Sequence, residues 1–401
     1  MSTARHGRCP RASHLGRPCA LPHVVAPKPG GISLSTNHSS TIRRIAVNTG
    51  GGDAPGLNAV IRAVTLAGID QGWEVLGIRR GYTGLLQEMV DEDPGVCVLD
   101  AHAVRGITHL GGTILGTSTR GNPFGLEVRQ PDGTTGTVDR SDEIISLFEE
   151  RGIDALIAIG GDGSLRIAHE LYRKGLPVVG VPKTIDNDLA ATDVTFGFQT
   201  AVEVATDAIG RLHSTAESHQ RVMVVELMGR HTGWIALESG MAGGADVILI
   251  PEIPFSVDRI VEKVLARERA GRRFSIVVVA EGASPRGGDP SYADEEGRYG
   301  GIAERLAGEI EELAEKETRT LVLGHIQRGG PPTAYDRNIS LRFGAAAVRC
   351  VAEGAMGTMV ALTGGDVRPV PLEDAVRDIK RVDPNCDAAQ TARQLGISFG
   401  D

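Results

Sequence analysis

Residues 177–188 read PVVGVPKTIDND, an apolar run that ends in a lysine, a threonine and two aspartates around an asparagine. The apolar part is typical of a buried strand. Charged side chains at the end of such a strand cost solvation free energy unless they are paired or bind a ligand. We therefore predict that Lys183, Asp186 and Asp188 stand at a ligand site at the end of a strand.

Six further apolar runs have the same character. The predicted strands are 44–49, 154–160, 177–182, 221–227, 246–251, 274–280 and 320–325. Residues 57–72 and 164–175 have apolar side chains at helical spacing and end in glycine. Strands that alternate with helices predict an α/β fold with mostly parallel sheets, covered on both faces. Ligands of such sheets bind at the carboxyl edge of the strands, where this sequence places its glycines and charged residues.

The composition is that of a globular protein: 41% of the 401 residues are hydrophobic and 23% are charged. The length suggests two domains. The formal net charge is −9, which argues against nucleic-acid binding. No apolar run approaches the ~18–20 residues needed to span a bilayer, so no membrane association is expected. The five cysteines are scattered and form no CxxC pair, so we predict no zinc site, no disulfide framework and a cytoplasmic location.

Residues 1–43 are rich in Arg, His, Pro and Ser and show no hydrophobic period. Their composition superficially resembles a mitochondrial transit peptide. We favour a disordered tail, or a start of translation assigned too far upstream, and exclude this segment from the fold prediction.

Two glycine-rich motifs share the order strand, glycines, aspartate, helix: NTGGGDAPGLNAVIR at 48–62 and IGGDGSLRIA at 159–168. Glycines allow the backbone to approach a phosphate, and a helix N-terminus offers free N–H groups and a favourable dipole. A turn with a capping aspartate is the alternative for either motif alone, but two copies favour phosphate binding. Neither motif has the Walker or the dinucleotide-binding pattern.

The aspartates after the 177–182 strand suit phosphoryl transfer to an alcohol. Such a reaction needs a carboxylate that takes the hydroxyl proton and a hard cation on the phosphate oxygens. Mg²⁺ takes one or two carboxylates and keeps several waters, so Asp186 and Asp188 can divide these tasks and Asp162 can share the metal. The alternative is an Asx-turn that caps the following segment. Arg120, in the glycine-rich stretch 111–124, is a candidate for stabilising the transferred phosphoryl group.

Basic residues gather near other strand ends, which suits an anionic substrate because guanidinium groups bind phosphate bidentately. They are Arg221, Arg230, Arg319, His325 and Arg328. We expect Met228, Gly229 and Glu281 to contact the remainder of a sugar.

The motifs together resemble the 6-phosphofructokinase family from about Arg44 to about Gly365. They occur in the family's order: GGDAPGLNAVIR at 51–62, GGDGS at 160–164, PKTIDND at 182–188, HQRVMVVELMGR at 219–230, PEIPF at 251–255 and LGHIQRGG at 323–330. The resemblance implies two similar Rossmann-like three-layer domains, with the active site in the cleft between them. It also implies Mg²⁺, ATP as the donor, fructose 6-phosphate as the acceptor, and a homotetramer or homodimer with shared sites. The implied donor domain is 44–197 plus about 327–370, and the implied sugar-phosphate domain is 198–326 plus about 371–401.

Residue roles follow from the resemblance at matching positions. Those implied to bind the donor are Gly51, Arg120, Gly121, Gly161, Asp162, Gly163 and Ser164. Those implied to act in the reaction are Asp186 as the base, Thr184 beside it, and Arg120 and Arg230 near the reacting phosphates. The implied metal ligands are Asp162 and Asp188. Those implied to bind fructose 6-phosphate are Thr184, Ile185, Asp186, Met228, Gly229, Arg230, Glu281, His325, Ile326, Gln327 and Arg328, with Arg221 and Arg319 lent by a neighbouring subunit.

Two positions bear on the choice of donor. Gly163 leaves room for a nucleotide α-phosphate, whereas the family's pyrophosphate users place an aspartate there. Lys183 resembles the lysine with which those pyrophosphate users hold their donor. We interpret the absence of the blocking aspartate as favouring ATP, with pyrophosphate as the alternative. A non-catalytic regulatory subunit is a third hypothesis, which the presence of Asp162, Asp186 and Asp188 disfavours. A nicotinamide-dependent oxidoreductase is a fourth, and it is disfavoured because the sequence lacks the dinucleotide-binding fingerprint.

The sequence also departs from the short bacterial enzymes of the family at two positions that concern regulation. Leu66 and His213 stand where those enzymes carry basic effector-binding residues. We therefore expect allosteric control that is weak or of a different kind.

Overall fold

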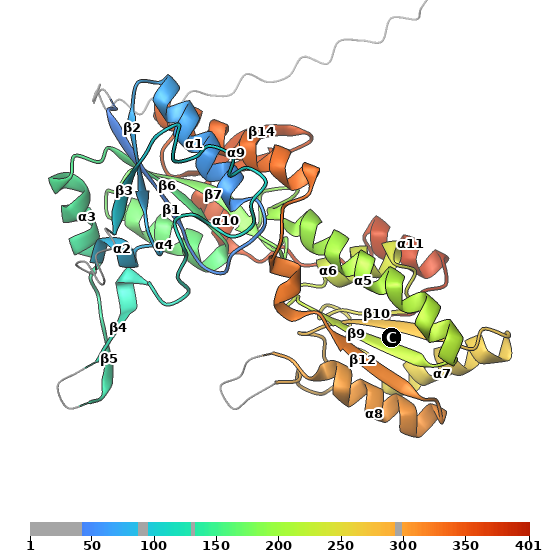
Figure 1. Cartoon of the computed structure of the whole chain (residues 1–401). Coiled ribbons are helices and arrows are strands. Elements are labelled where there is room, and N and C mark those ends of the chain that lie inside the picture. Colours follow the sequence, from blue (N-terminus) through green and yellow to red (C-terminus); the bar gives the residue numbers. More distant parts are fainter. Residues whose placement is uncertain (1–41, 87–94, 130–132, 293–298) are drawn as a thin grey trace, which may run out of the picture. The chain divides into compact units, whose positions relative to one another are not determined.

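The computed structural model describes residues 42–86, 95–129, 133–292 and 299–401 (Figure 1). The predicted tail, residues 1–43, falls outside this description except for its last two residues. Among the described residues, no helix is long and apolar enough to cross a membrane.

An eight-stranded mixed sheet contains the motif from which the prediction started. Its order is β14 (Asp366–Pro371), β13 (Thr358–Thr363), β7 (Val178–Thr184), β6 (Ala155–Gly160), β1 (Arg44–Thr49), β2 (Glu74–Ile78) and β3 (Val96–Leu99), with β8 (Phe196–Gly197) also paired to β7. Only the outermost pairs, β2–β3 and β13–β14, are antiparallel. The chain moves from β1 to β2 on one side and later to β6 on the other, so a topological switch point lies between β1 and β6. Such a point is where open α/β sheets bind ligands.

A second, four-stranded sheet is entirely parallel. Its order is β10 (Val247–Leu249), β11 (Ser275–Ala280), β9 (Val222–Leu227) and β12 (Thr318–Val322). A small antiparallel hairpin consists of β4 (Leu126–Arg129) and β5 (Thr135–Val138).

The helices cover both faces of the two larger sheets (Figure 1). They are α1 (Leu57–Asp70), α2 (Thr83–Leu86), α3 (Ser141–Glu150), α4 (Asp162–Arg173), α5 (Phe198–His219), α6 (Trp234–Ala242), α7 (Val257–Arg269), α8 (Ile302–Ala314), α9 (Ala334–Ala352), α10 (Leu372–Arg377) and α11 (Asp387–Gln394), with 3₁₀ turns η1 (Pro123–Gly125) and η2 (Gly324–Arg328).

Alternate residues of the strands enter different hydrophobic cores. In β1, Ile45 and Val47 pack with α1, whereas Ala46 faces the core that holds α3 and α4. In β9, Val222 and Val224 face the core with α7 and α8. This two-sided burial explains why the strands read as continuous apolar runs, and it confirms the predicted α/β class with mostly parallel sheets.

Strand β12 differs from the prediction that strands are covered on both faces. Four of its five residues, including Arg319 and Val322, are exposed or only half-buried. β12 is one edge of the second sheet, whereas β10 at the other edge is buried along its length and is bridged by Ser398.

A buried carboxylate joins α9 to the start of α5. Asp336 has no exposed surface and accepts hydrogen bonds from the backbone N–H groups of Gly197 (2.9 Å) and Thr200 (2.7 Å) and from the Thr200 hydroxyl (2.5 Å). These N–H groups have no partner inside α5, so Asp336 caps the helix from another element.

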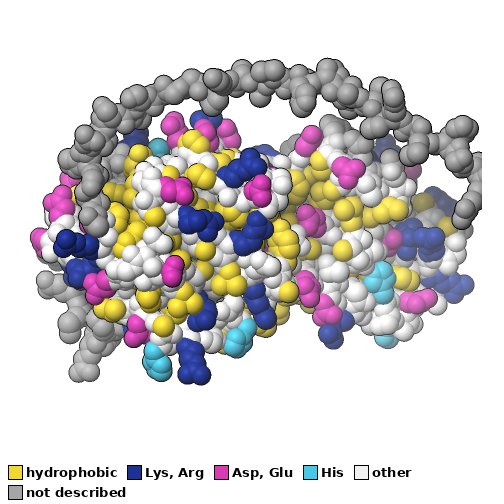
Figure 2. Space-filling view, turned by 90° about the horizontal axis from the view of Figure 1, so that it is seen from above, with side chains coloured by type: hydrophobic (Ala, Val, Ile, Leu, Met, Phe, Trp, Pro, Cys, Tyr) yellow, Lys and Arg dark blue, Asp and Glu magenta, His cyan; other side chains and the backbone are white. Residues whose placement is uncertain are grey.

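The chain returns to the first sheet after the second one. Strands β13 and β14 complete the first sheet, α10 packs on α4, and α11 packs on α6. The domain boundaries given above stay a prediction. On the face shown in Figure 2, acidic and basic side chains are interspersed rather than gathered by sign.

Candidate active site

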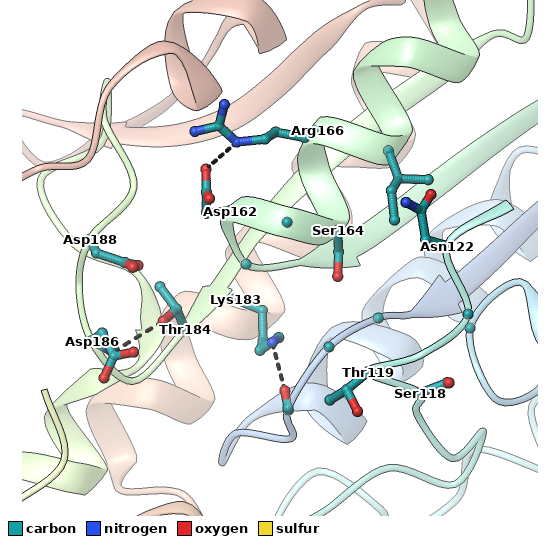
Figure 3. Close-up of a pocket in the computed structure, with 18 of the residues that line it drawn as sticks. Ser118, Thr119, Asn122, Asp162, Ser164, Arg166, Lys183, Thr184, Asp186 and Asp188 are labelled. Carbon is teal, nitrogen blue, oxygen red and sulfur yellow. Dashed lines mark hydrogen bonds and ion pairs between the residues drawn. The ribbon is translucent and has the colours of Figure 1, made fainter. Parts of the chain in front are cut away.

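A cavity of about 880 Å³ lies at the carboxyl ends of β1, β6, β7, β9 and β11 (Figure 3). Most of the residues predicted from the sequence line it. They are Gly51, Gly121, Gly161, Asp162, Gly163, Ser164, Lys183, Thr184, Asp186, Asp188, Met228, Arg230, Glu281 and Arg328. The cavity therefore brings together residues more than 250 positions apart in the chain.

The two glycine motifs meet in one wall of this cavity. A Cβ atom at Gly50 would lie 2.7 Å from Ser164 Oγ, so only glycine lets the loop after β1 approach the start of α4 this closely. Gly51 has a φ of 77°, a left-handed conformation that favours glycine. The N-terminus of α4, which begins at Asp162, opens into the same space. Free N–H groups and a positive dipole end there suit phosphate.

Lys183 is buried between these loops, with 3% of its surface exposed. Its Nζ donates a 2.6 Å hydrogen bond to the carbonyl oxygen of Gly52 (Figure 3). Burial, together with the nearby Arg328, lowers the pKa of Lys183 to about 8, although Asp186, Asp188 and Asp53 act in the opposite direction. The ammonium group therefore lies fixed at the glycine loops, as a point charge for an anion.

Two carboxylates face the cavity from the loop after β7. The Oδ1 atoms of Asp186 and Asp188 are shut off from solvent and have no hydrogen-bond partner among the described residues. Burial raises the pKa of Asp186, against the influence of Arg328, Lys183 and Arg230. Burial and the proximity of Asp186 raise the pKa of Asp188 to about 6. A buried oxygen without a partner is a position that a proton or a cation can satisfy.

The residues fit the hard cation that the sequence predicted. Asp162, Asp186 and Asp188 line the same cavity, and the charges of Asp186 and Asp162 contribute to the raised pKa of Asp188. Asp162 forms an ion pair with Arg166, Nε to Oδ1 3.0 Å, one helical turn along α4. No group of three or more His, Cys, Asp or Glu side chains within the described ranges could enclose a metal. Mg²⁺ needs only one or two carboxylates because it keeps waters and binds substrate phosphates, so Asp188 and Asp162 would suffice.

The second sheet supplies the opposite wall. Burial, followed by the charge of Asp186, raises the pKa of Glu281 to about 7. Arg328 donates from Nη1 to the carbonyl oxygen of Asp53 at 3.0 Å and so reaches the loop after β1. The guanidinium group of Arg230 lies 5.3 Å from the centre of the Tyr299 ring, a cation–π contact.

Several predicted residues do not line the cavity. They are Arg120, Ile185, Arg221, Gly229, Arg319, His325, Ile326 and Gln327. Arg120 is exposed although its neighbours line the cavity, Ile185 is fully buried in the core, and Ile326 is 66% exposed. Arg221 and Arg319 both pair with Glu317, at 3.2 and 2.6 Å.

The two positions tied to regulation lie elsewhere. Leu66 packs against the core, and His213 Nε2 lies 2.7 Å from the carbonyl oxygen of Gly243.

The cavity also holds residues that the sequence analysis did not single out. They are Gly50, Gly52, Gly81, Tyr82, Ser118, Thr119, Asn122, Phe124, Arg166, Ile167, Glu170 and His231. Helical spacing could have identified Arg166 and Glu170, which lie one and two turns after Asp162 on the same face. Nothing in the sequence marks Tyr82, because it sits outside any motif.

This arrangement can transfer a phosphoryl group to an alcohol. Glycine loops and a helix N-terminus face the same space as lysine and arginine side chains, and the Asp186 carboxylate, whose Oδ1 has no partner among the described residues, lies between them. Phosphoryl transfer depends on positioning and on charge stabilisation of this kind.

Comparison with known proteins agrees with this reading. Residues 44–351 match the family model described as Phosphofructokinase. The chain belongs to the phosphofructokinase family. As a phosphofructokinase it is an enzyme and a phosphotransferase.

Relatives named for different phosphoryl donors have similar sequence identity to this phosphofructokinase. It is 56% identical over 363 residues to "ATP-dependent 6-phosphofructokinase" of Chloroflexus aurantiacus, covering 90% of this chain and 99% of that protein. It is 52% identical over 349 residues to "Pyrophosphate--fructose 6-phosphate 1-phosphotransferase" of Amycolatopsis methanolica, covering 85% of this chain and 96% of that one.

Among solved structures, phosphofructokinase from Pichia pastoris in the T-state superposes with a TM-score of 0.72 at 34% identity. The match covers 86% of this chain but only 36% of that longer one. The pyrophosphate-dependent phosphofructokinase from Marinobacter aquaeolei has a TM-score of 0.72 at 23% identity, over 89% and 92% of the two chains, and supports the fold.

Proposed function

We propose that this phosphofructokinase transfers the γ-phosphoryl group of ATP to the 1-hydroxyl of D-fructose 6-phosphate, which gives fructose 1,6-bisphosphate and ADP. The observation that carries the proposal is the position of Asp186. Within the described part of the chain its Oδ1 has no hydrogen-bond partner, and the carboxylate lies between the glycine loops and the walls formed by Glu281, Arg230 and Arg328.

In this proposal Asp186 accepts the proton of the 1-hydroxyl as oxygen attacks the γ-phosphorus. Two interactions hold the loop: the Asp186 N–H donates to Thr184 Oγ1 at 3.1 Å, and Thr232 Oγ1 donates to the Asp186 carbonyl at 3.1 Å. Arg230 and Lys183 balance negative charge on the phosphates. Asp188 and Asp162 would hold Mg²⁺, which neutralises phosphate oxygens when it is bound.

The donor assignment depends on Gly163. A Cβ atom there would meet no other atom of the described residues within 4 Å, so the space beside it is open for a nucleotide phosphate. Lys183 favours the second candidate, pyrophosphate, because its ammonium group is already fixed at the glycine loops. The open space beside Gly163 has room for either donor. Among the described residues, no atom beside Gly163 would exclude ATP, which is the longer of the two.

A coupled assay tests both points. Purified protein is supplied with fructose 6-phosphate, Mg²⁺ and either ATP or pyrophosphate, and formation of fructose 1,6-bisphosphate is followed. We expect turnover with ATP. Turnover with pyrophosphate alone would refute the donor assignment, and no turnover with either donor would refute the proposed reaction.

We also propose that subunits share active sites and that Arg221 and Arg319 serve a neighbouring subunit's cavity in a homotetramer or homodimer. The support is that neither lines its own cavity, and that Glu317 holds both near one point. Mixing the separately inactive Arg221→Ala and Asp186→Ser proteins should restore activity in hybrid oligomers. Hybrids that form and stay inactive would show that each subunit builds its own site. A cytoplasmic location stays a prediction.

A further inference from the structure

A short segment after α10 lies against the loop that carries Asp186 and Asp188. Ile379 and Leu189 form an antiparallel β-bridge. The backbone N–H of Lys380 donates to the carbonyl oxygen of Asp188 at 2.8 Å. The loop after β7 therefore has a backbone partner from a part of the chain almost 200 residues away.

The side chain of Lys380 continues into the same loop. Its Nζ donates to Asn187 Oδ1 at 2.8 Å, to the Thr192 carbonyl at 3.0 Å and to the Asp193 carbonyl at 3.1 Å. An ammonium group has three donors, and all three are used inside this one loop. The ring centre of Trp234, the first residue of α6, lies 5.9 Å from Nζ.

Asn187 is the residue between the two carboxylates, and its backbone is unusual. Its φ is 51°, in the left-handed region, which asparagine enters more readily than most residues other than glycine. It is 5% exposed, and its Oδ1 accepts a second hydrogen bond from the Thr195 N–H at 3.2 Å. These two hydrogen bonds, from Lys380 and from Thr195, hold the Asn187 side chain in place. The direction in which Asp186 and Asp188 leave the backbone depends on the conformation of Asn187.

The same segment is tied to the loop after β9. The indole Nε1–H of Trp234 donates to the Lys380 carbonyl at 2.9 Å. Next along the chain, Arg381 donates to the His231 carbonyl at 3.1 Å, and the Val382 N–H donates to Glu252 at 2.9 Å. Glu252 in turn accepts from the Gly233 N–H at 3.1 Å. Lys380 is thus held between the two loops that supply Asp186 and Arg230.

We propose that Lys380 is a positioning residue for phosphoryl transfer, whose ammonium group holds Asn187 in its left-handed conformation and so directs the Asp186 and Asp188 carboxylates into the cavity. The role rests on the proposed function, because it concerns the geometry of that reaction. Lys380 does not itself line the cavity.

The test compares Lys380→Met with Lys380→Arg and with a matched control. Lys263→Met makes the same change at a lysine that also holds the C-terminal part of the chain, through the Gly396 carbonyl at 2.5 Å, outside the cavity. Because displacement of a catalytic group by about 1 Å can cost ~100-fold in rate, Lys380→Met should lower kcat about 100-fold. The KM for fructose 6-phosphate should stay within about 3-fold of the wild-type value. Lys380→Arg should recover most of the rate, and Lys263→Met should match the wild type.

Hydrogen–deuterium exchange gives a readout that does not depend on activity. Peptides covering 184–195 should exchange faster in Lys380→Met and at the wild-type rate in Lys263→Met. If Lys380→Met does not fold, Asn187→Ala tests the same link, since it removes one acceptor and leaves the two carbonyl acceptors in place; its kcat should fall similarly.

The outcomes separate the two proposals. A folded Lys380→Met protein with kcat within about 3-fold of wild type, or with unchanged exchange in 184–195, would overturn the role of Lys380 alone. Undiminished kcat in Asn187→Ala would do the same. A wild-type protein that is inactive with both donors would refute the proposed function, and the role of Lys380 with it.

Discussion

Gly163→Asp tests the donor pocket most directly, because the structure allows the change without damage to the fold. Gly163 is the second residue of α4, its φ is not positive, and an added Cβ meets no atom of the described residues within 4 Å. An acidic residue in the first turn of a helix is favourable to the dipole, and replacing glycine raises helix propensity. We therefore expect the free energy of unfolding to stay within ~1 kcal/mol of wild type.

The effect on ATP follows from the position of the new carboxylate. It would stand about 4 Å from a phosphate that approaches the N-terminus of α4, where like charges repel by ~4 kcal/mol at an effective dielectric constant of ~20. This corresponds to a loss of about 10³-fold in kcat/KM for ATP. Pyrophosphate is shorter and can avoid this position, so Lys183 should support activity with pyrophosphate in the variant.

The assay measures kcat/KM for ATP and for pyrophosphate, with fructose 6-phosphate saturating. Gly308→Asp is the matched control, because it adds the same charge at an exposed position of α8 where a Cβ also has open space. A Gly163→Asp protein that keeps kcat/KM for ATP within about 10-fold of wild type would refute the reasoning, since the α-phosphate would then not pass Gly163.

Three further outcomes are expected. Asp186→Ser should bind fructose 6-phosphate by calorimetry as the wild type does but lose ~10²–10⁴-fold in kcat, the range for loss of a general base; near-normal turnover would remove Asp186 from that role. The rate should fall as pH drops through about 6, the pKa of Asp188, because a protonated carboxylate binds no cation, and higher Mg²⁺ should move the inflection to lower pH; a flat profile between pH 5 and 7 would contradict this. Asp336→Ala leaves two backbone N–H groups at the start of α5 unsatisfied and should cost about 2–4 kcal/mol of stability in urea unfolding, whereas Asp207→Ala, which removes only an exposed pair with Arg211 on the same helix, should cost less than ~0.5 kcal/mol; equal losses would show that the cap is unimportant.

The sequence predicted strands best where both faces of the strand are buried, because apolar residues then fill every position. The predicted runs 44–49 and 154–160 correspond to β1 and β6 within one residue, because strands buried on both faces are apolar throughout. Strand β14, whose sequence is DVRPVP, lies at the edge of the first sheet and all its residues are exposed or half-buried, so it has no continuous apolar run. Strand β3 was missed for the same reason, since three of its four residues are only partly buried or exposed.

The candidate site divides in a similar way. Residues next to a strand end, such as Gly161 and Asp186, could be predicted because the fold brings strand ends together. The cavity residues His231 and Tyr82 could not be predicted, and neither could Lys380 outside the cavity, because their places depend on loop conformation and on contacts between segments far apart in the chain. The residues next to Lys380 in the sequence do not show whether its side chain contacts a loop almost 200 positions away or lies in solvent.

The position of the second sheet in the chain has a consequence for biosynthesis. Strand β7 is buried along all seven residues and lies between β6 and β13. Its partner β6 is made before it, but β13 begins only at Thr358, after the whole second sheet. At ribosomal speeds of ~5–20 residues per second, roughly 10–40 s pass between the two strands. During that interval an apolar strand edge lacks its partner on the growing chain, and such an edge can pair with another molecule. Translation speed across 185–357, and chaperones that shield β7 meanwhile, should therefore govern how much of this enzyme reaches its folded state in a cell.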